Sequence, residues 1–127
     1  MLIYLDTSAA MKLVIEEPES AALVDVITAG GRRLVASWLL HTELHCAAGR
    51  RPEAVDLGAV TTVLEAVDLV DITRGDLIAA GTLAPLRSND AIHLAVAIRL
   101  GVDGLLTYDH ELAATAVRAG LQVSAPN

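Results

Sequence analysis

Short apolar runs alternate with longer segments of helical periodicity along this chain, and that alternation restricts the possible folds more than any other feature. The runs with the length and composition of strands lie at 2–5, 34–37, 67–72, 105–107 and 121–123. The segments between them are predicted to be helical, at 9–15, 18–29, 39–48, 55–66, 76–83, 89–100 and 110–119. Strands joined through helices pair in parallel and are covered on both faces. The sequence therefore predicts an α/β fold, a single α/β/α sandwich over residues 1–127 with a parallel sheet of about five strands.

The composition restricts the kinds of partner that the chain can bind. Its 127 residues are enough for one domain with a real core. A net charge of −7 argues against a passive nucleic-acid binder, which would carry a basic face. With no Phe, one Trp and two Tyr, the chain also lacks platforms on which single-stranded bases could stack. If this protein acts on RNA, cations must mediate the approach.

No segment of the sequence has the features of a membrane span or a secretory signal. The most apolar stretch, 91–106, is interrupted by a histidine, an arginine and an aspartate, so it lacks the roughly 18 apolar residues that a span requires. Asp6 interrupts the start before a signal core can form. Cys46 is the only cysteine, which excludes internal disulfides and thiolate clusters, and its neighbours predict a buried, inert thiol. We expect a cytoplasmic protein without membrane association, whose surplus of apolar residues covers a partner surface.

Three aspartates stand where a parallel sheet forms its functional sites, beyond the carboxyl ends of strands and at a topological switch point. Asp6 and Asp109 each follow a predicted strand, and Asp90 begins the most apolar helix. Each of them alone also fits a helix cap or a partner of the helix dipole. Glu43 is different, because it lies inside a predicted helix among apolar or small residues. Unless it faces solvent, its carboxylate needs a compensating cation.

Together these acids predict a metal site. If the strands at 2–5 and 105–107 are neighbours, the four carboxylates meet in one cleft, where they repel one another unless a divalent cation is bound. Phosphodiester hydrolysis by two metals about 4 Å apart needs such hard oxygen ligands from several chain segments. We expect Mg²⁺ or Mn²⁺ there, with hydroxyls of Thr7 and Ser8 available as additional donors or as helix caps.

Four segments resemble, in order and spacing, the signature of the PIN-domain family. They are LDTSA at 5–9, TEL at 42–44, NDAIHLA at 89–95 and LTYDHEL at 106–112. The match runs nearly end to end and is similar in particular to VapC-like toxins of toxin–antitoxin pairs. The resemblance implies a homodimeric α/β/α sandwich that acts as a metal-dependent endoribonuclease and is blocked by a small antitoxin protein. It also implies a catalytic and metal-binding quartet: Asp6, Glu43, Asp90 and Asp109.

Other enzyme classes that begin with a strand ending in Asp fail on particular residues. A phosphatase of the haloacid-dehalogenase type needs a second acid two residues later, where this chain has Ser8. A response-regulator receiver needs paired acids at the first strand and a lysine late in the chain, whereas the only lysine is Lys12. A catalytically silent PIN-like domain that only binds partners stays open, although the intact quartet argues against it.

Histidines and arginines offer further candidates. His41 and His45 have the i, i+4 spacing of a zinc pair, but no third ligand is evident. His93 is predicted either to be a satisfied core histidine or to face the cleft. The arginine pairs at 32–33 and 50–51 are predicted to be solvated or to contact RNA phosphates. Lys12 is predicted to lie on the surface. Four further aspartates fit edges, turns and helix starts and need no other role: Asp68, Asp71, Asp76 and Asp103.

Overall fold

Five short strands lie side by side in one parallel sheet in the computed structural model, which describes residues 1–127. The strands are β1 (Leu2–Leu5), β2 (Arg33–Ser37), β3 (Asp68–Val70), β4 (Gly104–Leu106) and β5 (Val123–Ser124). Their order is β3-β2-β1-β4-β5, and all four pairs are parallel. The predicted parallel α/β architecture is confirmed. The first strand pairs with the strand near residue 105, which is the condition under which the acids that follow them come together.

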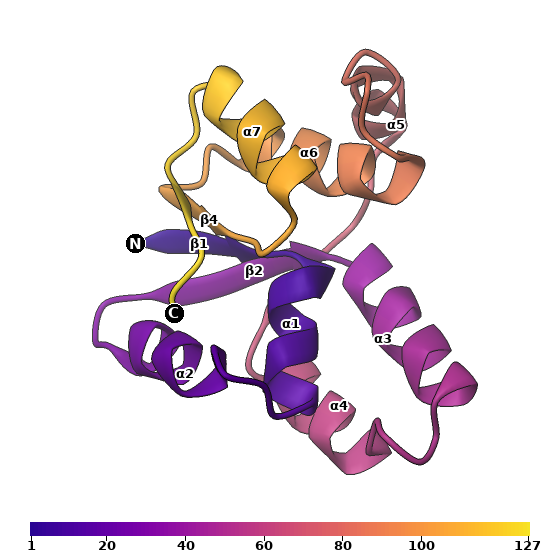
Figure 1. Cartoon of the computed structure of the whole chain (residues 1–127). Helices are drawn as coiled ribbons and strands as arrows, with labels where there is room; N and C mark the ends of the chain where they lie inside the picture. Colours follow the sequence, from indigo (N-terminus) through magenta and orange to yellow (C-terminus); the bar gives the residue numbers. More distant parts are fainter.

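Seven helices connect the strands. They are α1 (Thr7–Val14), α2 (Ser20–Thr28), α3 (Leu39–Arg50), α4 (Leu57–Glu65), α5 (Arg74–Ala80), α6 (Ser88–Leu100) and α7 (His110–Arg118). Figure 1 shows α1 to α4 on one face of the sheet and α5 to α7 on the other, so the sheet is enclosed between two helical layers. None of these helices has both the length and the apolar character needed to traverse a lipid bilayer.

Capping side chains, rather than hydrophobic periodicity, determine where several helices begin. The Asp6 carboxylate accepts a hydrogen bond from the Ala9 N–H, so α1 begins at Thr7, two residues before the predicted start. A capping box between Thr73 and Asp76 begins α5 before its predicted start as well. These helix starts come from side-chain to backbone hydrogen bonds that apolar spacing does not reveal.

The centre of the core is β1, which has a neighbouring strand on each side. Tyr4 and Leu5 have no exposed surface, and Leu105 and Leu106 of β4 are 1% exposed. Leu5 is in register with Leu106, which brings the residues that follow the two strands next to each other. The tight packing of β1 against β4 therefore positions whatever chemistry lies at their carboxyl ends.

Asp76 lies in the first turn of α5, the helix start that the sequence predicts, and it also has a structural role that the sequence does not reveal. Its side chain is only 3% exposed, and the Arg99 guanidinium donates two hydrogen bonds to it, at 2.7 and 3.0 Å. Those hydrogen bonds hold the pKa of Asp76 below its ordinary value, despite the opposing effect of burial. The ion pair joins α5 to α6, whose N-terminal turn carries Asp90.

We expect Asp76→Asn to lower the free energy of unfolding at pH 7 by about 1–3 kcal/mol, the usual contribution of hydrogen bonds to a charged group. Because the pKa of Asp76 is lowered by folding, this stabilisation is complete above its unfolded-state pKa of about 3.9. It is lost as the pH falls through the folded-state pKa. Denaturant titrations of the variant and the parent at pH 7 and at about pH 3 measure the change.

The matched control is Asp68→Asn, because Asp68 forms an ion pair with Arg33 in which both side chains are more than half exposed. An exposed pair of this kind contributes less than about 1 kcal/mol. Equal losses of stability from the two variants at pH 7 would contradict the structural role given to Asp76.

Candidate active site

Two of the four predicted acids lie at the carboxyl ends of neighbouring strands. Asp6 follows β1 directly, and Asp109 comes three residues after the end of β4. Both cap a helix, since Asp109 accepts a hydrogen bond of 2.8 Å from the Leu112 N–H just as Asp6 accepts one from Ala9. The connections from β1 and β4 lead to opposite sides of the sheet, so these caps lie at its topological switch point. The two predicted roles of these residues, helix cap and site residue, are therefore compatible.

Hydroxyl groups connect the two strand ends. Thr107 donates a hydrogen bond of 2.6 Å to Asp6 Oδ2 and accepts one of 3.1 Å from the Asp109 N–H. Ser8 donates to both Asp6 oxygens, at 2.8 and 2.9 Å, and accepts from the Tyr108 N–H. The sequence interpretation named Ser8 but missed Thr107. The position of Thr107 at the end of a predicted strand was the signal in the sequence that could have identified it.

Glu43 is not on the solvent face of α3, since its side chain is only 21% exposed. Thr7 donates a hydrogen bond of 2.6 Å to Oε1, and His93 Nε2 lies 2.6 Å from the same oxygen. Asn89 contributes a longer contact of 3.4 Å to Oε2. Hydrogen bonds from α1 and α6 thus supply the compensation that a carboxylate in an apolar helix requires.

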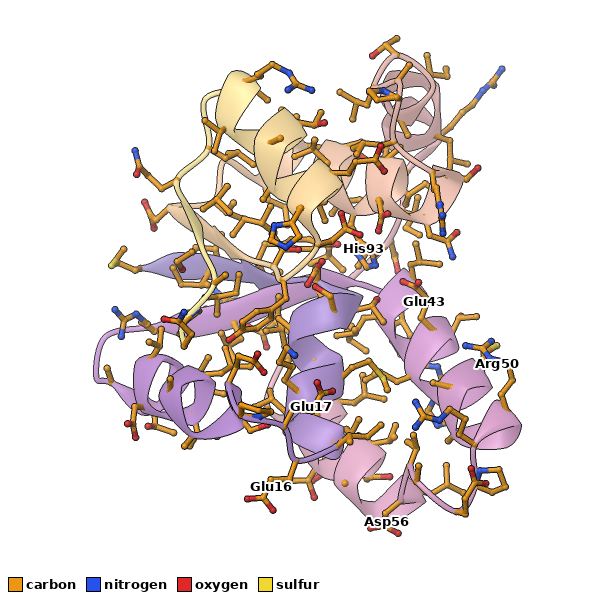
Figure 2. The ribbon with its side chains drawn as sticks, viewed as in Figure 1. Glu16, Glu17, Glu43, Arg50, Asp56 and His93 are labelled. Carbon is orange, nitrogen blue, oxygen red and sulfur yellow. The ribbon has the colours of Figure 1, made fainter.

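His93 is both a buried histidine and a site residue, so the two predicted alternatives hold together. Its side chain is 1% exposed, and Nδ1 lies 2.7 Å from the hydroxyl of Tyr4. Figure 2 shows His93 next to Glu43 at the end of α3 nearest the sheet. That same Tyr4 hydroxyl accepts a hydrogen bond of 3.0 Å from the Ser37 N–H. A continuous chain of hydrogen bonds therefore runs from β2 through β1 and α6 to Glu43.

The direction of this chain follows from the donors and acceptors. Burial raises the pKa of Tyr4 to about 12, so the phenol keeps its proton. With Ser37 donating to the phenol oxygen, the phenol proton has His93 Nδ1 as its acceptor. The ring proton of His93 is then on Nε2, from which it is donated to Glu43. Every polar atom of the chain has a partner in this arrangement, and no buried side-chain polar atom of the protein lacks one.

Asp90 lies in the first turn of α6, and no hydrogen bond or ion pair involves its half-buried carboxylate. Burial raises the pKa of Asp90 above its ordinary value, and the negative charges of Asp109 and Asp6 raise it further. Burial also raises the pKa of Asp6, despite hydrogen bonds from Thr107, Ala9 and Ser8. The structure thus brings acids from four chain segments close enough to interact electrostatically.

The pKa of Glu43 is shifted in the opposite direction from the pKa values of Asp90 and Asp6. Burial raises its pKa, but the hydrogen bonds from His93 and Thr7 outweigh burial and leave the pKa below its ordinary value. Glu43 is therefore ionised at neutral pH, and it brings a full negative charge to the edge of the cluster. The charge on Glu43 is one more cause of the raised pKa of Asp90.

The donor atoms suit a hard divalent cation, although the four acids are not arranged as a closed ligand set. No three His, Cys, Asp or Glu side chains converge as a ready metal cluster. Hydrogen bonds occupy both oxygens of Asp6, both oxygens of Glu43 (Oε2 only through the longer contact to Asn89) and one oxygen of Asp109. The oxygens without a hydrogen bond are both of Asp90 and Oδ2 of Asp109. Carboxylate oxygens are the ligands that Mg²⁺ and Mn²⁺ prefer, and a cation would offset the repulsion at Asp90.

The structure also bears on three predictions outside the acidic cluster, those for the cysteine, the lysine and the histidine pair of α3. Cys46 is exposed and lines the hollow between α1 and α3, so the prediction of a buried thiol is wrong. Lys12 is not free on the surface, since its side chain is 14% exposed and pairs with Glu17 and Glu19 at 3.0 Å each. The rings of His41 and His45 stack at 4.2 Å without a third metal ligand beside them.

The parallel sheet in the order β3-β2-β1-β4-β5, with acids gathered at the ends of β1 and β4, is an α/β fold with its candidate site at the switch point. Residues 3–118 match the family model described as the PIN domain. The chain belongs to the PIN-domain family, as its sequence motifs predict.

The chain is also similar to curated proteins along nearly its whole length. It is 41% identical to Ribonuclease VapC46 of Mycobacterium tuberculosis, with 98% of each chain covered. It is 34% identical to Ribonuclease VapC47 of the same species, over 98% of this chain and 97% of that one.

Solved structures show the same fold at low sequence identity. VapBC2 from Rickettsia felis, bound to a DNA fragment from its promoter, has a TM-score of 0.80 at 14% identity and full coverage of both chains. VapC20 of Mycobacterium tuberculosis, described as a toxin that cleaves the sarcin–ricin loop, has a TM-score of 0.75 at 18% identity, with 98% of this chain and 99% of that one covered.

The electrostatics of Asp90 predict that Asp90→Asn does not destabilise the protein. A pKa that folding raises means that the folded state disfavours the ionised form, so removing that charge at pH 7 relieves a cost. We expect a melting temperature at or above that of the parent by differential scanning calorimetry.

Asp25→Asn is the control, because Asp25 is an exposed acid of α2 without a hydrogen bond or ion pair. It removes the same net charge away from the cluster. A melting temperature for Asp90→Asn below that of Asp25→Asn would show that the acids do not repel one another in the folded protein.

Proposed function

We propose that this protein is a metal-dependent endoribonuclease that acts as the toxin of a toxin–antitoxin pair and hydrolyses RNA phosphodiester bonds. The observation that carries the proposal is the Asp90 carboxylate, which has no partner and lies in the field of Asp6 and Asp109. Acids arranged in this way favour a cation and disfavour RNA in its absence. The proposal agrees with the relatives, which are named Ribonuclease VapC.

Asp6, Glu43, Asp90 and Asp109 are the proposed catalytic residues and the proposed ligands of Mg²⁺ or Mn²⁺. A bound divalent cation supplies activation of the attacking water and stabilisation of the leaving oxygen. Thr107 and Ser8 hold the Asp6 carboxylate in one orientation. His93 and Thr7 fix Glu43 Oε1, so that Oε2 is the oxygen directed to a metal or to the attacking water. The protein's part is to hold these oxygens in position around the scissile phosphate.

The proposed partners are an RNA substrate, a small antitoxin and a second copy of this chain in a homodimer, all in the cytoplasm. Apolar side chains support the protein contacts, since Leu77 and Ile78 of α5 are 53% and 67% exposed. A basic antitoxin tail is the proposed inhibitor, because its Arg or Lys can replace the cation among the acids. Structures with this fold include VapBC complexes such as VapBC-1 from nontypeable Haemophilus influenzae.

The test is incubation of the antitoxin-free protein with a structured RNA pool in Mg²⁺, in Mn²⁺ or in EDTA. We expect cleavage at discrete sites that EDTA abolishes. Asp90→Asn and Asp6→Asn should be folded and should cut at least about a hundredfold more slowly, because loss of a preorganised charged group costs about that much. Sequencing of the RNA ends gives the cleaved positions.

Asp25→Asn is again the control and should cut at the parental rate. Parental activity in Asp90→Asn or Asp6→Asn would contradict the assignment of the acids. No cleavage with either metal, by a protein shown to be folded, would instead favour a catalytically silent PIN-like domain that binds partners.

A further inference from the structure

A hollow of about 470 Å³ lies between α1 and α3 and reaches the candidate site at one end. Thr7, Glu43 and Asn89 line that end. Arg50 and Arg51 line the opposite end, and apolar atoms of Met11 and Ala47 and the exposed Cys46 lie between them. The hollow is thus acidic beside the site and basic at its far end.

The helix itself sets the spacing between the two ends. Glu43 and Arg50 are seven residues apart on α3, which is about two turns, so both lie on one face at a separation of about 10 Å along the axis. Figure 2 shows both side chains on α3, with Glu43 near the sheet and Arg50 toward the other end of the helix. A polynucleotide whose scissile phosphate meets the acids therefore has a neighbouring phosphate within reach of the arginines.

The two arginine pairs differ in whether their guanidinium groups already have a hydrogen-bond or ion-pair partner. Arg33 pairs with Asp68, and Arg32 donates to the carbonyl of Val26. Arg50 and Arg51 are exposed, and no hydrogen bond or ion pair involves either guanidinium. The two arginine pairs, equivalent in sequence, are therefore different in structure.

Free cations matter in a protein with a net charge of −7, because its overall field repels RNA. An arginine at the end of a helix also interacts favourably with the helix dipole, but that interaction is worth only about 0.3–1 kcal/mol and leaves the guanidinium free to bind. A guanidinium binds phosphate oxygens through two parallel hydrogen bonds, and apolar walls strengthen that contact.

We propose that Arg50 and Arg51 form a phosphate-binding site that holds the RNA backbone beside the candidate active site. The proposal rests on the proposed ribonuclease function and adds to it the path of the substrate along α3. It assigns to the second arginine pair a role that the first pair, at 32–33, does not share.

The test is the affinity of Arg50→Gln/Arg51→Gln for a short fluorescein-labelled single-stranded RNA, measured by anisotropy in an Asp90→Asn background with Mg²⁺. The slope of log K against log salt is negative, and each lost phosphate contact makes it shallower by about 0.7 for single strands. We therefore expect a slope less steep by about 1.4 and binding about 25-fold weaker at 0.1 M salt, with the difference vanishing near 1 M. Arg32→Gln/Arg33→Gln is the matched control and should change the slope by less than half as much.

The outcomes separate this proposal from the proposed function. A parent that neither binds nor cuts RNA overturns the ribonuclease. A parent that binds and cuts, with unchanged slope and affinity in Arg50→Gln/Arg51→Gln, overturns the phosphate site alone. An equal effect of both double variants also overturns it, because the loss then follows net charge and not position. Loss of a protein partner by the 50–51 variant, with RNA binding intact, likewise overturns the phosphate site.

A second inference rests on the buried hydrogen bonds behind Glu43. The chain from Ser37 through Tyr4 to His93 contacts no solvent, since Tyr4 is fully buried and His93 is 1% exposed. A neutral histidine in this position can accept from the phenol on one ring nitrogen and donate to the carboxylate from the other. The phenol therefore selects the tautomer, and the tautomer determines the orientation of Glu43 Oε1.

We infer that Tyr4 and His93 are positioning residues that direct Glu43 in the proposed reaction. Loss of the partners behind an active-site group typically costs 10- to 100-fold in activity. Tyr4→Phe keeps the ring that packs edge-on against His93 and removes only the hydroxyl. We expect kcat for RNA cleavage to fall about tenfold or more in this variant, with KM unchanged.

A spectroscopic measurement tests the inference without relying on activity. The ¹⁵N shifts of His93 in the parent should show a protonated Nε2 and an unprotonated Nδ1, and Tyr4→Phe should shift this ratio toward the other tautomer. His93→Gln, which retains a donor for Glu43, should recover part of the kcat that His93→Leu loses. A protonated Nδ1 in the parent, or parental kcat in Tyr4→Phe, would overturn the inference even where the parent cuts RNA.

Discussion

The register between β1 and β4 is the constraint on which the site depends. Leu5 lies opposite Leu106, and the Asp6 N–H donates to the Leu106 carbonyl, so the next residues of both strands share one edge of the sheet. Thr107 then reaches Asp6 by a hydrogen bond of 2.6 Å. A slip of one residue would turn every side chain of β1 to the other face and separate these groups. The packed core around β1 determines the register, and the register determines which side chains meet at the strand ends.

The four acids differ in how many hydrogen bonds their carboxylates accept, and this difference supports the proposed position of a cation. Asp6 and Glu43 each accept hydrogen bonds from several donors, which offset part of the cost of burying a charge. Asp90 receives none and lies in the field of its neighbours. Hydrogen bonds therefore hold Asp6 and Glu43 in place, whereas Asp90 has only its raised pKa to ease the repulsion, which a bound cation or a basic ligand would offset in the proposed function.

Much of the fold could be predicted from the sequence, because strands and helices of an α/β sheet differ in apolar spacing. The edge strand predicted at 121–123 forms as β5, shifted to Val123–Ser124, and the first strand does neighbour the strand near residue 105. Features that depend on long-range contacts were missed. The ion pair of the buried Asp76 with Arg99 is one example, and the hydrogen bond between His93 and Tyr4, 89 positions earlier, is another. The exposed face of α3 that carries Cys46 was also misjudged, since its neighbours in sequence are apolar.

The central claim is that Asp6, Glu43, Asp90 and Asp109 form one cation site, and paramagnetic NMR tests it most directly. Mn²⁺, titrated into the ¹⁵N-labelled protein, broadens amide signals near its binding position long before distant ones. We predict that the first signals to vanish are those around Asp90 and Asp109, followed by those around Asp6, and that Asp90→Asn prevents the loss. Broadening that begins elsewhere, such as among the exposed acids Glu16 and Asp25, would contradict the claim.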